Sequence, residues 1–218
     1  MMVILGLTGS IAMGKTTAAE MFARLGVPVF DADRAVHRLL GRGGAAVAAV
    51  EAAFPGTVRE GAVDRQALAA RVFDDEAKLR TLEAILHPQV EADQNRFLRW
   101  AARNRRRLVV LDVPLLFETA GERVCDAVAV VSAPAFLQEQ RLLRRSGMTR
   151  ERLEAIRNRQ APDASKLRRA DFIIPSGLGR ALTRRAIAAL IDELQRGRGR
   201  KWTPAQSRRR LDGVCRRG

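Results

Sequence analysis

The sequence predicts an α/β fold in which a five-stranded parallel sheet is flanked by helices, and three observations support this prediction. Five short apolar runs have the composition of strands, amphipathic stretches with helical spacing separate them, and the connections are long. Parallel strands need long crossover connections, which are usually helices. The predicted strands are residues 3–7, 27–30, 108–112, 126–131 and 172–174.

The first two strands frame a glycine-bearing loop and a helix. Residues 16–25 follow the loop with helical periodicity, and Gly26 suits the C-terminal cap of that helix. The second strand, residues 27–30, leads to Asp31-Ala32-Asp33, and helical spacing resumes through Leu40. The order strand, helix, strand is that of a parallel sheet, so we expect residues 1–43 to begin the core.

A helical insertion is predicted for residues 44–107, which contain no convincing strand. Asp64 can cap a helix that runs to Phe73, residues 75–86 form another amphipathic stretch, and Pro88 can open a third helix. The core then resumes over residues 108–195. Within it, residues 134–169 form a cationic helical stretch that we interpret as a lid, and a last helix covers about residues 180–195.

Composition points to a cytoplasmic protein with a sizeable core. Hydrophobic residues make up 47% of the chain, and no apolar run approaches the roughly 20 residues that span a bilayer. No cationic segment precedes the first strand, so we expect no signal peptide. Cys125 and Cys215 are too few for a disulfide framework and lack the spacing of metal ligands.

The net charge of +15 raises the question of nucleic-acid binding, but the charge is concentrated at one end. Residues 196–218 hold nine basic residues and one acidic residue, a net charge of +8. We expect this segment to be a flexible, solvated tail that binds polyanions at most weakly. Tyrosine is absent and aromatic residues are few, which is poor equipment for stacking on bases. We therefore expect no specific nucleic-acid partner.

The loop after the first strand matches the phosphate-binding pattern G-x-x-x-x-G-K-[ST], with Gly9, Gly14, Lys15 and Thr16 at its defining positions. Successive backbone N–H groups in such a loop point at one anion, and the following helix directs its positive end at the same place. Lys15 can reach the outer phosphates, and the Thr16 hydroxyl can ligate Mg²⁺. The sequence therefore predicts a P-loop core that binds the phosphates of a nucleotide. The loop alone does not distinguish a kinase from a switch GTPase, an ATPase motor or a nucleic-acid enzyme.

An acidic pair follows the second predicted strand. Ligands of open parallel sheets bind beyond the carboxyl ends of the strands. A carboxylate there can orient an acceptor hydroxyl and take its proton, a role that we assign to Asp33. The alternative is that Asp31 and Asp33 cap the next helix, and one of them is expected to do so.

Asp112 ends the third predicted strand and precedes an apolar segment. A carboxylate at this position can hold the Mg²⁺ shell, often through water, although it can also simply cap a turn. The apolar residues from Val113 to Phe117 lie beyond a strand's carboxyl end, where they can line an acceptor pocket.

Arginines of the predicted lid can neutralise the charge that phosphoryl transfer gathers on the phosphate oxygens. Arg141, Arg144 and Arg145 share one helical face by spacing, and Arg157 follows on the next helix. The alternative is a solvated cationic face, which an arginine-rich chain readily produces. Arg141 is the strongest single candidate for a catalytic role.

Taken in order, these motifs resemble those of the bacterial dephospho-CoA kinase family. The resemblance covers residues 3–194, and its most distinctive part is the segment Asp-Val-Pro-Leu-Leu-Phe-Glu from Asp112 to Glu118. The other motifs are Thr8-Gly9 leading into the phosphate loop, Asp31-Ala32-Asp33, His87-Pro88, Gln140-Arg141-Leu142, Gln160 and Ala170-Asp171.

The resemblance implies transfer of the γ-phosphoryl group of ATP to the ribose 3′-hydroxyl of dephospho-CoA, which gives CoA and ADP as the last step of coenzyme A biosynthesis. The two substrates are the implied partners, and the oligomeric state stays open. The implied catalytic residues are Asp33, Lys15 and Arg141, and the metal site is Thr16 and Asp112. The implied nucleotide contacts are Gly9, Ala12, Met13, Gly14, Lys15, Thr16, Thr17, Arg145 and Arg157. The implied acceptor contacts are Thr8, Asp33, Arg65, His87, Pro114, Leu115 and Phe117.

Several of these acceptor residues also have ordinary structural interpretations. Thr8 can be a strand-end hydroxyl bonded to the backbone, Arg65 a surface residue in a first helical turn, and His87 a helix-start residue before Pro88. The chain also departs from the family at its phosphate loop, where Ser10, Ala12 and Met13 replace more typical residues, and at Ser176, where an asparagine is common. The alternatives to the implied function are another small-molecule P-loop kinase, for nucleosides or nucleotides, and a nucleic-acid-binding protein.

Overall fold

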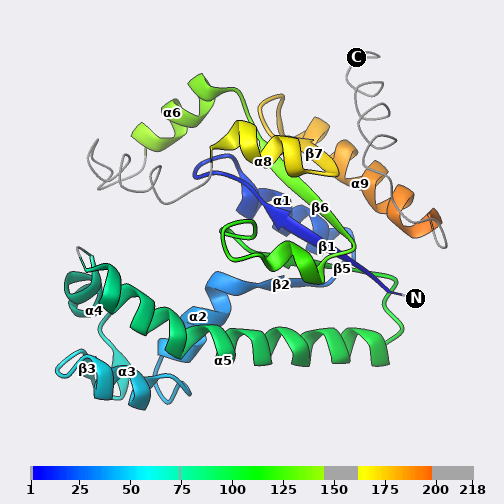
Figure 1. Cartoon of the computed structure of the whole chain (residues 1–218). Coiled ribbons are helices and arrows are strands. Elements are labelled where there is room, and N and C mark those ends of the chain that lie inside the picture. Colours follow the sequence, from blue (N-terminus) through cyan, green and yellow to red (C-terminus); the bar gives the residue numbers. More distant parts are fainter. Residues whose placement is uncertain (1, 74, 145–161, 198–218) are drawn as a thin grey trace. The chain divides into compact units, whose positions relative to one another are not determined.

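The computed structural model describes residues 2–73, 75–144 and 162–197, and the fold is given for these residues. They form two compact units (Figure 1). The second unit is Asp31–Trp100, and the first comprises the described residues before and after it. The sequence predicted a helical insertion over residues 44–107, and these domain boundaries stay a prediction.

The first unit is built on a five-stranded parallel sheet with the strand order β2-β5-β1-β6-β7, which confirms the predicted fold class. Its strands are β1 (Val3–Thr8), β2 (Val29–Asp31), β5 (Leu108–Asp112), β6 (Ala127–Ser132) and β7 (Phe172–Pro175). In the central register, Leu7 pairs with Asp112 and Thr8 pairs with Val130. The carboxyl ends of three neighbouring strands therefore meet at one edge of the sheet, where the phosphate loop leaves β1.

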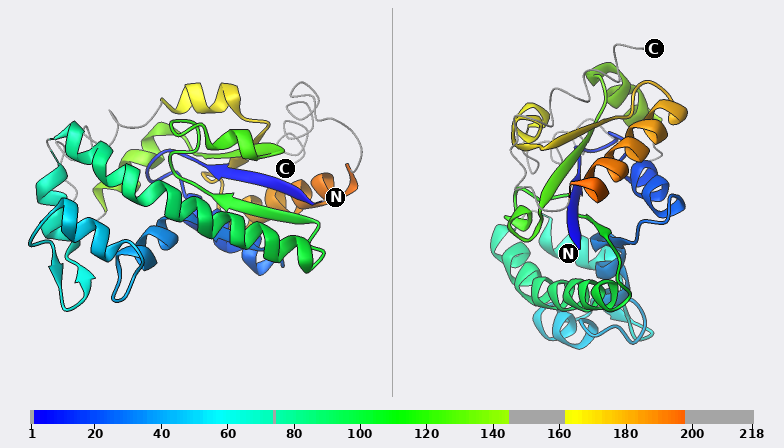
Figure 2. Two further views of the ribbon diagram at one scale, coloured as in Figure 1. Left: turned by 60° about the horizontal axis from the view of Figure 1, so that its bottom comes forward. Right: turned by 90° about the vertical axis from the view of Figure 1, so that its right-hand side faces the viewer.

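Helices cover both faces of this sheet (Figure 2). On one face lie α1 (Lys15–Arg24) and α9 (Arg180–Arg196), and on the other lies α8 (Asp163–Arg169). The residues of strand β6 alternate between the two faces of the sheet, so they contribute to a separate core on each face. Ala129 and Val131 pack into the larger core with α1 and α9, whereas Val128 and Val130 pack into a smaller core with Leu116 and Leu167.

Two further elements of this unit lie close to the ends of the strands in sequence. The 3₁₀ helix η1 (Gly121–Val124) leads into β6, and α6 (Ala135–Leu143) follows it. The predicted lid spans residues 134–169, of which 145–161 lie outside the described residues. The predicted tail also lies outside them, apart from Arg196 and Gly197.

The second unit is mainly helical, but it also contains a short pair of strands that the sequence analysis did not predict. Val58 and Val63 pair in a short antiparallel hairpin. Its elements are α2 (Ala32–Leu40), α3 (Val47–Ala53), β3 (Val58–Arg59), β4 (Ala62–Val63), α4 (Arg65–Val72) and α5 (Glu76–Arg103), the last of which ends in the first unit. Strands of two residues have too little alternation to be visible in a sequence. Val50, Leu68 and Leu86 are among the buried residues that hold this unit together.

The predicted cap of α4 is confirmed. The Asp64 carboxylate accepts hydrogen bonds from the backbone N–H groups of Gln66 and Ala67, at 3.0 and 3.1 Å. These bonds favour the charged form, so the bond from Ala67 above all lowers the pKa of Asp64 below its ordinary value of 3.8. Asp75, directly before α5, likewise accepts a hydrogen bond from the backbone N–H of Lys78, and this bond lowers the pKa of Asp75.

The prediction that Pro88 opens a separate helix is wrong, because α5 runs continuously through it. Proline has no N–H group for the preceding turn and usually ends or kinks a helix. Leu82, Leu86 and Val90 pack into the core of the unit on both sides of Pro88, so tertiary packing overrides the local signal.

Across the described ranges, 2–73, 75–144 and 162–197, no helix is both long and apolar enough to cross a membrane.

Candidate active site

The phosphate loop occupies the predicted place between β1 and α1. Gly14 and Ala12 have positive φ angles of 88° and 60°, so the backbone turns twice through the left-handed region. Gly9 is required for a different reason, since a Cβ atom there would lie 2.7 Å from the carbonyl oxygen of Val131. The start of the loop is therefore pressed against β6, and no larger residue fits at Gly9.

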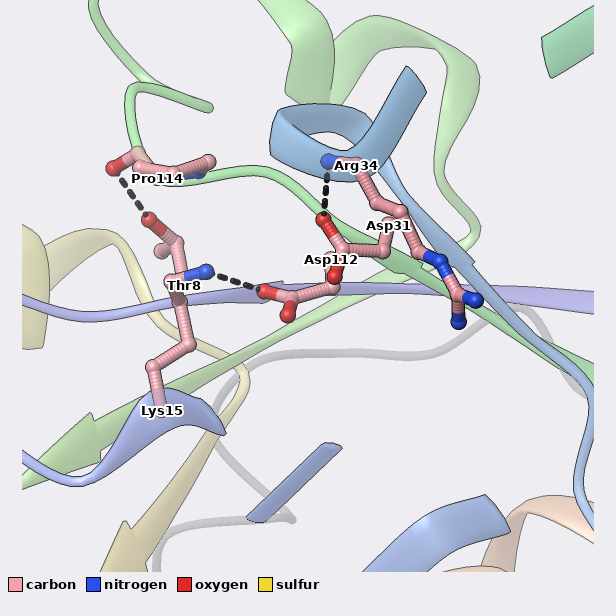
Figure 3. A network of polar contacts seen from close by, with 6 residues as sticks. All are labelled: Thr8, Lys15, Asp31, Arg34, Asp112 and Pro114. Carbon is pink, nitrogen blue, oxygen red and sulfur yellow. Dashed lines mark hydrogen bonds and ion pairs between the residues drawn. The ribbon is translucent and has the colours of Figure 1, made fainter. Parts of the chain in front are cut away.

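Lys15 and Asp112 form an ion pair at the carboxyl ends of β1 and β5, with Nζ 2.6 Å from Oδ1 (Figure 3). The side chains are 15% and 4% exposed, so little solvent screens their attraction. Thr16 follows at the exposed start of α1, and Thr17 is half-buried. The structure thus brings together the lysine and the carboxylate that the sequence assigned to phosphate and metal.

Thr8 turns its hydroxyl away from solvent. It is fully buried and donates a 2.9 Å hydrogen bond to the carbonyl of Pro114 (Figure 3). This bond favours the structural alternative for Thr8, a strand-end hydroxyl that holds the segment after β5. It leaves the hydroxyl with no exposed surface toward an acceptor.

The segment after Asp112 divides into buried and half-buried residues. Pro114 and Leu115 are half-buried, whereas Leu116 and Phe117 belong to the smaller core. The Arg169 guanidinium lies 4.2 Å from the centre of the Phe117 ring, a cation–π contact. Phe117 therefore anchors the segment, while Pro114 and Leu115 keep surface for a ligand.

Glu118 ends the segment beside a fully buried lysine, Lys166. The Lys166 ammonium nitrogen lies 3.0 Å from Oε1 of Glu118, in a direction that gives an ion pair without a well-formed hydrogen bond. The Glu118 side chain is 19% exposed, whereas that of Lys166 is inaccessible. This pair ties the segment after β5 to α8.

Arg141 lies beside the phosphate loop, the position that its proposed catalytic role requires. Its guanidinium donates to the carbonyl of Ala12 at 3.3 Å and to the carbonyl of Ser176 at 2.7 Å. It also donates to the Ser176 hydroxyl at 3.2 Å. The predicted nucleotide contacts Arg145 and Arg157, together with Gln160, lie outside the described residues.

Three residues that the sequence analysis did not assign to the site also contact the phosphate loop. Gln138 donates to the carbonyl of Ile11 at 2.9 Å, and the Ser176 hydroxyl donates to the carbonyl of Met13. Asp163 accepts a 2.9 Å hydrogen bond from the Ser10 hydroxyl. The one signal in the sequence was Ser10, which stands where glycine is more typical, because a buried hydroxyl needs a hydrogen-bond partner. Its partner is 153 positions away in sequence, so the pair could not be identified.

In the second unit, the two acidic residues after β2 have different roles. Asp31 is the N-cap of α2, and its carboxylate accepts from the backbone N–H of Arg34 at 2.8 Å (Figure 3). Asp33 lies in the first turn of the helix and is exposed. Among the described residues its carboxylate has no hydrogen bond or ion pair, so it is available to a ligand.

The other predicted acceptor residues of this unit are also exposed. Arg65 begins α4 and shares a 2.9 Å hydrogen bond with the His37 ring. His87 lies inside α5, directly before Pro88, so the alternative that it starts a helix is wrong. Both side chains are on the surface of the unit, where they can reach a ligand.

Cys125 is a poor candidate for a catalytic nucleophile. Burial above all, together with the neighbouring charges of Asp126 and Glu122, raises the pKa of its thiol to about 12. A thiol of this kind is almost wholly protonated near neutral pH and is a poor nucleophile.

Comparison with known proteins agrees with the geometry. The family model for dephospho-CoA kinase matches residues 3–178. A dephospho-CoA kinase of Paramagnetospirillum magneticum is 66% identical over 165 residues, which cover 76% of this chain and 78% of that protein. A dephospho-CoA kinase of Mesorhizobium japonicum is 55% identical over 201 residues, covering 91% of this chain and all of that protein. The crystal structure of TT1252 from Thermus thermophilus has a TM-score of 0.75 at 34% identity and covers 88% of this chain and 98% of that one.

Proposed function

The chain belongs to the dephospho-CoA kinase family, whose activity is the ATP-dependent phosphorylation of dephospho-CoA, and we propose how its described residues carry out that transfer. The acceptor atom is the ribose 3′-hydroxyl, and the products are CoA and ADP. The observation that carries the proposal is the loop from Gly9 to Thr16, whose Lys15 is paired with Asp112 at 2.6 Å. Neither a nucleoside kinase nor a nucleic-acid-binding protein is favoured.

The donor side of the reaction belongs to the first unit. The backbone N–H groups of the loop and the start of α1 bind the phosphates of ATP, because both direct positive partial charge at one point. Lys15 adds a full charge at the outer phosphates. Met13 is buried, so its contribution and that of Ala12 come from their backbone groups and not from their side chains.

The donor set also fits Mg²⁺, which is a proposal. A hydroxyl at Thr16 and a carboxylate at Asp112 are the hard oxygen ligands that this ion prefers, and it commonly takes only one or two ligands from the protein besides phosphate and water. When bound with ATP, the ion supplies positive charge to the β- and γ-phosphate oxygens.

The acceptor side depends on Asp33. Its exposed carboxylate can accept the hydrogen of the 3′-hydroxyl, orient the oxygen and take the proton as the new bond to phosphorus forms. Arg65, His87, Pro114 and Leu115 are proposed acceptor contacts. Arg141, with Arg145 and Arg157, is proposed to neutralise the transferring group, and the contact of Arg141 with Ala12 supports this assignment. Most of the acceleration then comes from positioning and electrostatics.

The test is an acceptor panel with the purified full-length chain. ADP release should be stimulated by dephospho-CoA and not by nucleosides, nucleotides or shikimate, and the product should carry its phosphate on the 3′-oxygen by ³¹P NMR. Stimulation by a nucleoside in place of dephospho-CoA would contradict the proposal. Lys15→Ala should impair both ATP binding and turnover, because it removes the charge at the outer phosphates.

The cytoplasmic location and the absence of a specific nucleic-acid partner also stay proposals. The basic segment 196–218 can be tested by a salt-dependent gel shift that compares the full chain with one cut after Gln195. Weak binding that disappears with the cut is expected, and strong binding that survives the cut would show a nucleic-acid surface elsewhere.

A further inference from the structure

The outer side of the phosphate loop is held by side chains from other elements. A loop that points its N–H groups at an anion must turn its carbonyl groups outward, and each outward carbonyl needs a donor of its own. The carbonyls of Ile11, Ala12 and Met13 receive hydrogen bonds from Gln138, Arg141 and Ser176, respectively. These donors come from α6 and from the turn after β7, so the shape of the loop depends on residues far from it in sequence.

Ser10 gives the loop a fourth outer attachment, through its side chain. It is 8% exposed, and its hydroxyl donates to Oδ1 of Asp163 at 2.9 Å. The other oxygen of the same carboxylate, Oδ2, accepts from the Ser132 hydroxyl at the end of β6, also at 2.9 Å. One carboxylate therefore links the phosphate loop, β6 and the first residue of α8.

The rest of the loop shows why this attachment matters. Ala12 holds a left-handed backbone conformation that a residue with a Cβ atom rarely adopts, so the loop is under local strain. Such a conformation persists only when its surroundings fix it. Backbone bonds from Met13 to Ser10 and from Ala18 to Gly14 lie within the loop region, and the outer attachments add to them.

We propose that Asp163 is a positioning residue for ATP binding, which it assists by holding Ser10 and thereby the amide-lined face of the phosphate loop. The proposal rests on the assignment of this loop to ATP in the preceding subsection. Asp163 does not touch the nucleotide. Its effect reaches the nucleotide through Ser10, and a bond to a charged acceptor is stronger than one between neutral groups.

The experiment measures three variants of the full-length chain, namely Ser10→Ala, Asp163→Ala and the two changes combined. Each is compared with a fourth variant, Ser132→Ala. Ser132→Ala is the matched control, because it removes one hydroxyl from the same carboxylate but leaves the loop attachment intact. ATP affinity is measured by isothermal titration calorimetry, the KM for dephospho-CoA by coupled assay, and folding by thermal denaturation. Wild-type chain that binds no ATP would instead refute the assigned function.

Ser10→Ala and Asp163→Ala should each weaken ATP binding about tenfold, the effect expected from the loss of one charge-assisted hydrogen bond. The double variant should be little worse than either, because both remove the same contact. The KM for dephospho-CoA should stay nearly constant, and Ser132→Ala should bind ATP almost normally. Ser10→Ala with normal ATP affinity would overturn the proposal, even if Asp163→Ala fails to fold. Equal losses in Ser10→Ala and Ser132→Ala would also overturn it, because Asp163 would then only anchor β6 to α8.

Discussion

The two compact units differ in how far their polar residues are buried and paired. In the first unit, Lys15 is mostly buried and paired with Asp112, and the fully buried Lys166 is paired with Glu118. In the second unit the predicted acceptor residues Asp33, Arg65 and His87 are exposed. A triphosphate is bound by fixed backbone and charged groups, which need a rigid frame, whereas exposed side chains can adapt to a large acceptor. Removing a buried, paired charge of the first unit should therefore lower stability, whereas substitutions of Asp33, Arg65 or His87 should change turnover and leave stability nearly unchanged.

The largest expected effect is on turnover, in Asp33→Asn. Loss of the proton acceptor should lower kcat by about a hundredfold or more, while ATP affinity and melting temperature stay near those of the wild type. Steady-state kinetics and calorimetry would measure the two parts. Asp31→Asn is the matched control, since asparagine also caps helices and kcat should change little. Near-normal turnover in Asp33→Asn would show that Asp33 is not the base.

Lys166→Met should give the largest loss of stability, about 2 kcal/mol in the free energy of unfolding measured with urea. Removing one partner of a buried pair typically costs more than that, but Glu118 keeps some access to water. The exposed pair Arg80–Glu76 of the second unit offers the contrast, and Arg80→Met should cost no more than about 0.5 kcal/mol. Equal losses in the free energy of unfolding in the two variants would contradict the difference between the units.

Ala12→Gly should raise or preserve stability, by up to about 1 kcal/mol. Glycine adopts the left-handed conformation of this position without strain, and that gain opposes its greater freedom in the unfolded chain. Ala189→Gly, on the exposed side of α9, is the control and should instead lose about 1 kcal/mol. Thermal denaturation of both variants measures the difference, and a loss in Ala12→Gly as large as that in Ala189→Gly would contradict the assigned strain.

The smallest expected effect concerns acid stability in the second unit, through Asp64. Its pKa is lowered on folding, so its charge stabilises the fold above its ordinary pKa of 3.8, and this contribution is lost as the pH falls through the lowered value. Asp64→Asn keeps a cap but does not titrate. The wild type should therefore be the more stable chain near neutral pH, and this advantage should shrink as the pH falls below 3.8 toward the lowered pKa, as melting curves by circular dichroism would show. An advantage independent of pH would contradict the assignment.

Local patterns were enough to predict much of the fold. Five apolar runs of the right length predicted the five strands, and the spacing of Gly9, Gly14 and Lys15 predicted the phosphate loop, because those features depend on neighbouring residues. The continuity of α5 through Pro88 and the β3–β4 hairpin were not predicted. In both cases packing against a core assembled from distant residues outweighs the local signal of a proline or of a very short strand.

The sequence by itself determined the loop, its lysine and the two carboxylates at strand ends, since each is encoded by residues that are close together along the chain. Only the tertiary structure decided which groups these residues face. It paired Lys15 with Asp112, turned Thr8 toward Pro114 and brought Asp163 to Ser10 across 153 positions. The physical reason is that a hydrogen bond or ion pair depends on distances of about 3 Å in space, and only folding sets those distances for residues far apart in the chain.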